Sequence, residues 1–158
     1  METARQLSDR FKEVFLDGTW IANTNYKNEL EHVNWEMATK KIETLNTIVA
    51  LTYHVNYYVQ GVLEVLEGGP LRIRDAYSFD FDHINSQEDW EALKISLLDN
   101  ALKFANNVAS ISNARLDNAF ADPKYGNYRR NIEGLIEHSY YHLGQITLIK
   151  KQVLSSLT

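Results

Sequence analysis

Two histidines four residues apart, His138 and His142, are the residues whose types and spacing most clearly suggest chemistry. They lie in the stretch IEHSYYHLGQI, residues 136–146, whose apolar residues recur at helical spacing. Side chains at positions i and i+4 lie one above the other on a helix, so both imidazoles can bind one ion without distorting the backbone. A single histidine on an apolar face is more often a satisfied core residue. Burying two imidazoles without partners is costly, and this raises the case for a metal site.

A third ligand should come from another helix, and His54 is the natural candidate. It lies mid-way along a second long predicted helix, on the flank of the buried stripe and in one row with Tyr58 and Gly61. We expect Gly61 to leave space beside His54. By contrast, His32 and His83 fall in an irregular segment and in a loop, where we expect them to be exposed.

Two better-known metal motifs do not fit. The pair His138 and His142 lacks the glutamate of the zinc-protease motif H-E-x-x-H. Glu29 and His32 form one E-x-x-H pattern, but a di-iron bundle needs two such pairs and the sequence has no second one. A site of three neutral imidazoles would instead leave a divalent ion with an open coordination position, as catalytic sites do. Zinc and nickel are the ions we expect first, and iron, cobalt and manganese are also compatible.

Gln145 and Tyr58 are candidates for contacts with the second ring nitrogen of a ligand histidine, or with a substrate. The alternative interpretation is equally strong at both positions. It makes Tyr58 a helix-packing side chain and Gln145 a partly exposed one. The sequence leaves this choice open.

Four long amphipathic helices would have to position these residues. The glycine and proline positions separate them, as in Gly68-Gly69-Pro70 after the second helix. Thr24 and Asn34 are expected to open two short helical pieces between the first two long helices, and residues 70–85 to form a loop. The pattern predicts an all-α fold, a four-helix bundle whose long connections allow a crossover. The four predicted helices cover about residues 3–16, 44–67, 86–112 and 128–154.

Composition limits the other function classes. The chain of 158 residues has the length of one domain, residues 1–158. It contains no cysteine, which excludes disulfides, thiolate metal ligands and a cysteine nucleophile.

The net charge of −5 and the scattered basic pairs disfavour nucleic acid as a partner. No run approaches the length of a membrane span, and the charged N-terminus is unlike a secretory signal, so we expect a cytoplasmic protein without membrane contact.

The chain resembles the DinB/YfiT-like superfamily over essentially its whole length. The resemblance lies in TIVALTYHVNYYVQGVLEVLEGG around His54 and in NIEGLIEHSYYHLGQITLIKK around His138 and His142. It implies a four-helix bundle, usually a homodimer, with a divalent metal ion bound by His54, His138 and His142. Some members of the superfamily use the metal to activate a low-molecular-weight thiol, such as bacillithiol or mycothiol, for S-transfer or isomerisation.

These observations predict a metal-dependent enzyme that acts on a small-molecule substrate, in the first place a thiol-dependent S-transferase. Because the chain has no cysteine, the thiol would have to come from solution. Three alternatives stay open: a non-catalytic metal-binding stress-response protein, a metal-dependent hydrolase, and a bundle that binds a small ligand without metal.

Overall fold

The computed structural model describes residues 1–157, which form an all-α structure without a β-strand. The predicted fold class is therefore confirmed at this level. Within the same residues, no helix combines the length and apolar composition needed to cross a membrane. The helices are α1 (Ala4–Lys12), continued by the π-helical segment η1 (Glu13–Asp17), α2 (Tyr26–Glu31), α3 (Trp35–Thr39), α4 (Ile48–Leu66), α5 (Gln87–Ser110), α6 (Asn113–Leu116) and α7 (Tyr128–Ser155), with 3-10 turns η2 (Asp75–Tyr77) and η3 (Pro123–Tyr125).

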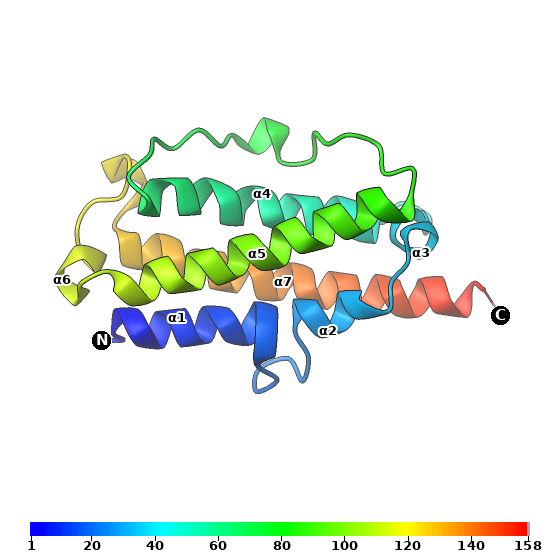
Figure 1. Cartoon of the computed structure of the whole chain (residues 1–158), viewed down its shortest axis with the longest axis horizontal. Coiled ribbons are helices and arrows are strands. Elements are labelled where there is room, and N and C mark those ends of the chain that lie inside the picture. Colours follow the sequence, from blue (N-terminus) through cyan, green and yellow to red (C-terminus); the bar gives the residue numbers. More distant parts are fainter. Residues whose placement is uncertain (158) are drawn as a thin grey trace.

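The long helices α1, α4, α5 and α7 lie side by side (Figure 1). Both α5 and α7 pack against α1 and against α4. Figure 1 also shows that α4 and α5 run in the same direction, because the connection between them returns along the length of α4. This connection, residues 67–86, is the crossover that the long interhelical segments allow.

Short polar side chains determine where several helices begin. Thr47 accepts a hydrogen bond from the backbone N–H of Ala50, so α4 begins at Ile48 and the predicted start at residue 44 is wrong. Asn25 caps α2 in the same way, and the expectation that Thr24 would do so is also wrong. Neighbouring residues of capping type compete at such positions, and Thr47 and Asn25 are the ones whose side chains accept the hydrogen bond.

The apolar face of α7 fixes the rotation of this helix and so directs its histidines. Ser139, in the middle of that face, is buried, and its carbonyl accepts a 2.7 Å hydrogen bond from the Tyr26 hydroxyl. With this face in the core, His142 is buried and His138 half-buried toward α4. The buried apolar residues of α7 are Ile132, Leu135, Ile136, Leu143, Ile146, Ile149 and Val153.

Gly61 serves a different purpose from the one expected. A Cβ at this position would overlap the side chain of Ile73, which belongs to the connection between α4 and α5. The glycine thus makes room for that connection and not for His54. The close approach of Ile73 to α4 places residues 70–85 over His54. Ser78 and Asp75 of this connection therefore lie at the site described below.

Candidate metal centre

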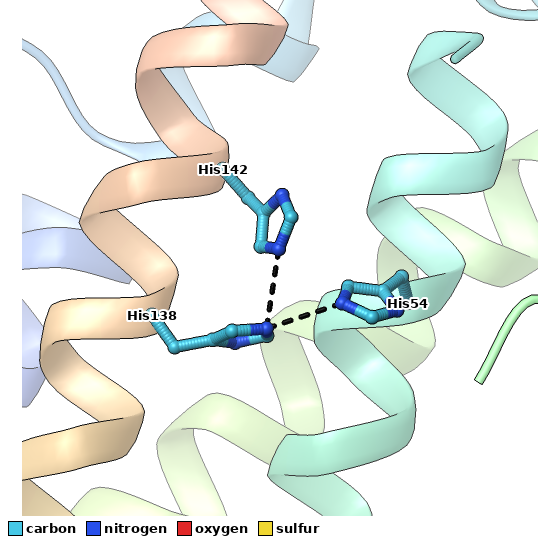
Figure 2. Close-up of side chains that lie close together, drawn as sticks. All are labelled: His54, His138 and His142. Carbon is cyan, nitrogen blue, oxygen red and sulfur yellow. Dashed lines mark hydrogen bonds between the residues drawn. The ribbon is translucent and has the colours of Figure 1, made fainter. Parts of the chain in front are cut away.

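Figure 2 shows three imidazole rings that point toward one another from two helices, His54 from α4 and His138 and His142 from α7. The Nε2 atom of His138 lies 3.1 Å from the Nε2 atom of His54 and 3.1 Å from that of His142. One ligand nitrogen from each ring lies within 4.8 Å of the other two. The structure therefore brings together the three histidines that the sequence singles out.

These separations suit a single divalent ion. Nitrogen ligands of a tetrahedral zinc ion, each about 2.0–2.1 Å from the metal, lie about 3.3 Å from one another. The two observed separations of 3.1 Å differ from that value by only a few tenths of an ångström. Small side-chain rotations can supply such a difference, and the ligand nitrogens of the third pair, His54 and His142, lie within 4.8 Å of each other.

Hydrogen bonds to the outer ring nitrogens orient two of the three ligands. The Nδ1 atom of His54 lies 3.3 Å from the carbonyl oxygen of Ser78, and that of His142 lies 2.7 Å from Oε1 of Gln145. Both partners are acceptors, so Nδ1 donates in each ring and Nε2 is left with its lone pair. This is the tautomer that a metal ligand needs, with the outer nitrogen held as in known metal sites.

The inner nitrogen of His138 carries the clearest argument for an ion. A neutral imidazole nitrogen holds either one proton or one lone pair, so this Nε2 can make one good hydrogen bond and not two. It nevertheless faces two lone-pair nitrogens at 3.1 Å. A cation between the three lone pairs satisfies all of them at once. The donor set present in the chain thus fits a divalent metal ion.

His138 differs from the other two ligands at its outer nitrogen. Its Nδ1 atom is buried and has no hydrogen-bond partner among residues 1–157. The ring packs against that of Tyr58 in a T-shaped arrangement, with the ring centroids 5.1 Å apart. We therefore expect the orientation of His138 to depend on Tyr58.

The surroundings of the three histidines lower their pKa values, which favours the neutral imidazole. Burial, followed by the neighbouring His142 and His54, lowers the pKa of His138 to about 4. Burial also lowers the pKa of His54 and that of His142. Since a metal ion competes with protons for the same nitrogen, neutral imidazoles at pH 7 favour binding.

A pocket of about 460 Å³ adjoins the centre, and His138 forms part of its wall. The volume is that of a small-molecule site. Its polar lining comes from Tyr58, Asp75, Tyr125, Arg130 and Asn131. The apolar lining comes from Val62, Leu71, Ile73, Phe120 and Leu135.

Asp75 is a site residue that sequence reasoning missed. Its Oδ1 atom accepts a 2.7 Å hydrogen bond from the hydroxyl of Tyr58, and both side chains line the pocket with His138. Burial, followed by this bond to Asp75, raises the pKa of Tyr58 to about 12, so the phenol stays protonated. An acidic residue in a loop carries no pattern of its own. Tertiary contacts place Asp75 here: Ile73 packs against Gly61, and the Tyr57 hydroxyl forms hydrogen bonds with the backbone of Arg74.

The remaining candidates lie elsewhere. His32 and His83 are exposed, as expected. Glu29 forms an ion pair with Lys150 at 3.2 Å and accepts a hydrogen bond from Thr24, so it does not take part in a di-iron arrangement. Of the two candidates for outer contacts, Gln145 holds His142, while Tyr58 lies against His54 and His138 and faces the pocket.

Comparison of the chain with protein-family models, curated proteins and solved structures yields no match. Membership of the DinB/YfiT-like superfamily therefore stays a prediction.

Proposed function

We propose that this protein is a metal-dependent enzyme built as a four-helix bundle of the DinB/YfiT-like type. His54, His138 and His142 bind one divalent ion, and a small molecule reacts in the adjoining pocket. The observation that carries this proposal is the convergence of three Nε2 atoms, two of them held as lone-pair donors, with His138 also in the pocket wall. An ion buried only to tie helices together would need no such pocket.

The chemistry follows from the ligand set. A divalent ion with three neutral imidazole ligands keeps its full charge and an open position, so it can lower the pKa of bound water to about 7 or hold a thiol as the thiolate. Zinc or nickel suits the site best, and imidazole also binds iron, cobalt and manganese. The reaction we propose is S-transfer, in which the sulfur of a small cellular thiol bonds to an electrophilic carbon and the leaving group departs with the electron pair. The thiol comes from solution, because the chain has no cysteine.

The pocket residues contribute to proton handling in this scheme. Asp75 lines the same wall as His138, and its carboxylate can accept the proton that the nucleophile loses. Tyr58 keeps its own proton and donates a hydrogen bond to Asp75, which holds the carboxylate in place. Removal of the Asp75 carboxylate should therefore lower turnover more than it lowers metal content.

A metal-dependent hydrolase is the second candidate, and Asp75 is the observation that favours it. A carboxylate beside a three-ligand ion suits a general base that activates water as well as one that activates a thiol. The two reactions differ in their second substrate and not in the residues, so only assays separate them.

Elemental analysis of the untagged protein is the first test. We expect about one divalent ion per chain, and a sharp loss of metal in His54→Ala, His138→Ala and His142→Ala. The exposed His32 and His83 provide matched controls, whose alanine variants should keep the wild-type content. Equal metal content in all five variants would refute the ligand assignment.

Activity is tested separately. Metal-loaded and chelated protein are compared for conjugate formation between electrophiles and bacillithiol, glutathione or free cysteine, and then for hydrolysis of ester and amide substrates. Metal-dependent conjugation supports the transferase. Metal-dependent hydrolysis alone supports the second candidate, and metal binding without either reaction supports a non-catalytic, stress-response type of metal protein.

A further inference from the structure

Gly134 occupies a position in α7 where a glycine is not explained by packing. Glycine is disfavoured inside helices, and α7 has 28 residues with Gly134 well within it. A Cβ at this position would meet no heavy atom within 4 Å. Gly61 is the contrasting case, because a Cβ there would overlap Ile73. The space beside Gly134 is instead part of the pocket that His138 lines.

Three of the residues that line the pocket form a row along α7. Arg130, Gly134 and His138 follow one another at intervals of four residues, so they lie on one side of the helix, and all three line the pocket. Eight residues of α-helix span about 12 Å, and Gly134 lies at the middle of that length. The missing side chain at Gly134 thus leaves a hollow on this side of α7, in the pocket that Arg130 and His138 also line.

The guanidinium of Arg130 is available to a ligand. Its Nη1 atom lies 3.3 Å from Oε2 of Glu137, which is seven residues further along α7, so the side chain extends toward His138. Both side chains are mostly exposed, and ion pairs of this kind contribute little to stability. A ligand carboxylate can therefore replace Glu137 and form the paired hydrogen bonds that guanidinium groups favour.

The surroundings add positive charge to this end of the pocket. A neighbouring hollow shares Leu71, Ile73 and Tyr125 with the pocket and is lined by Arg72, Arg74 and Lys124, against Asp122 alone. Lys124 is paired with Asp122, whereas neither Arg72 nor Arg74 forms an ion pair with any of residues 1–157. Within the described part of the chain, the pocket itself contains one carboxylate, Asp75, which already accepts a hydrogen bond from the Tyr58 hydroxyl, and one guanidinium, Arg130. The unpaired cations of the neighbouring hollow therefore leave this end of the pocket positively charged, which favours an anionic ligand.

We infer that the pocket binds a small molecule with an apolar body and one carboxylate, and that Gly134 determines the size of body it admits. The carboxylate pairs with Arg130, the body lies over Gly134 between the apolar walls, and the reacting end reaches His138. Only the identity of that reacting end rests on the proposed function. The pocket itself can be tested without metal.

The test uses chelated, full-length protein and two probes of the same shape, phenylpropionate and its neutral amide, phenylpropanamide. Binding is measured by ligand-observed NMR titration, which detects weak complexes. We expect the wild type to bind the carboxylate about five- to tenfold more tightly than the amide, since a charge-assisted hydrogen bond supplies the difference. Arg130→Gln should remove this preference. Glu137→Gln should strengthen carboxylate binding about two- to threefold by freeing Arg130.

Gly134→Leu is the decisive variant, because its side chain enters open space and fills the pocket. It should weaken both probes by about tenfold or more while leaving helix content unchanged. Gly144→Leu is the matched control: it lies on the same helix, a Cβ there also meets no atom within 4 Å, and it lies outside the pocket. Equal binding by Gly134→Leu and wild type, or no preference for the carboxylate in the wild type, would overturn the inference.

Metal content of the same variants separates this result from the proposed function. Gly134→Leu and Arg130→Gln should take up metal like the wild type. If the wild type binds no metal but the probe data follow the expected pattern, the proposed function fails and the carboxylate pocket stands. If metal binds but the probes show no pattern, only the pocket inference is lost.

Discussion

The Nδ1 atom of His142 lies 2.7 Å from Oε1 of Gln145, three residues further along α7. This spacing puts both side chains on one face of the helix, so a purely local contact fixes which nitrogen of His142 faces the centre. The bond connects His142, a proposed metal ligand, to Gln145, which is not proposed as a ligand. Gln145 should accordingly act on metal affinity through His142.

Gln145→Leu should weaken metal binding about tenfold, because outer partners of ligand histidines typically contribute tenfold or more. Gln145→Glu keeps an acceptor and should stay within about threefold of the wild type. Affinity is measured by competition with a chromophoric chelator. Gln152→Leu, an exposed position on the same helix, is the control and should not change affinity. A loss of equal size in Gln145→Glu would contradict the role of an acceptor.

Tyr58 is expected to hold His138 by ring contact and Asp75 by its hydroxyl, and two substitutions separate these roles. Tyr58→Phe keeps the ring and should retain metal affinity while turnover falls. Tyr58→Ala removes both and should weaken metal binding by about tenfold, as loss of an orienting group does. Both quantities are measured on the same preparations. Wild-type metal affinity in Tyr58→Ala would show that the ring does not position His138.

Removal of metal should lower the melting temperature and leave the protein folded. An ion that binds only the folded state stabilises it by about 2.7 kcal/mol when its free concentration is 100 times the dissociation constant. The apolar core does not depend on the ion, since it extends along all four long helices. Calorimetry with and without chelator gives the shift, and circular dichroism gives the helix content. Complete unfolding on chelation would assign the ion a structural role.

The metal-free protein should lose stability as the pH falls from about 6.5 to about 4. The unfolded chain takes up protons on its histidines near pH 6.5, whereas folded His138, with its pKa lowered to about 4, does not. The unfolded state then binds more protons in this window, so the free energy of unfolding decreases with decreasing pH. Chemical denaturation at several pH values measures the slope. His138→Gln should show a shallower slope than wild type, and the same substitution at exposed His32 should not.

Assembly as a homodimer is the last prediction, and it comes from the resemblance to the DinB/YfiT-like superfamily. Tyr141 and Leu148 are exposed on α7, and Leu148 lines a hollow together with Leu45. Such exposed side chains suit an apolar interface, where tyrosine is enriched. Sedimentation at micromolar concentration should give about twice the mass of one chain. Tyr141→Glu should shift that equilibrium toward the monomer. A monomeric wild type at this concentration would contradict the prediction.

Helical periodicity was sufficient to predict the all-α class and the approximate extent of the long helices. A helix buries one stripe of side chains, and that stripe is visible as a repeat of 3.6 residues. The starts of α2 and α4 were less predictable. Several neighbouring residues can cap a helix, as with Thr24 and Asn25, and the path of the connecting chain selects one of them.

The sequence by itself determined which two histidines share a face of α7, because residues four apart on a helix must do so. It also made His54 the natural third partner. Only the tertiary structure decided that the three rings meet, since that depends on how α4 and α7 pack. The places of Asp75 and Ser78 were likewise decided by packing, where Ile73 fits against Gly61 and carries the crossover connection over the site. Contacts between residues distant in the chain depend on how well the packed side chains fit together. The periodicity of a single helix does not predict that fit.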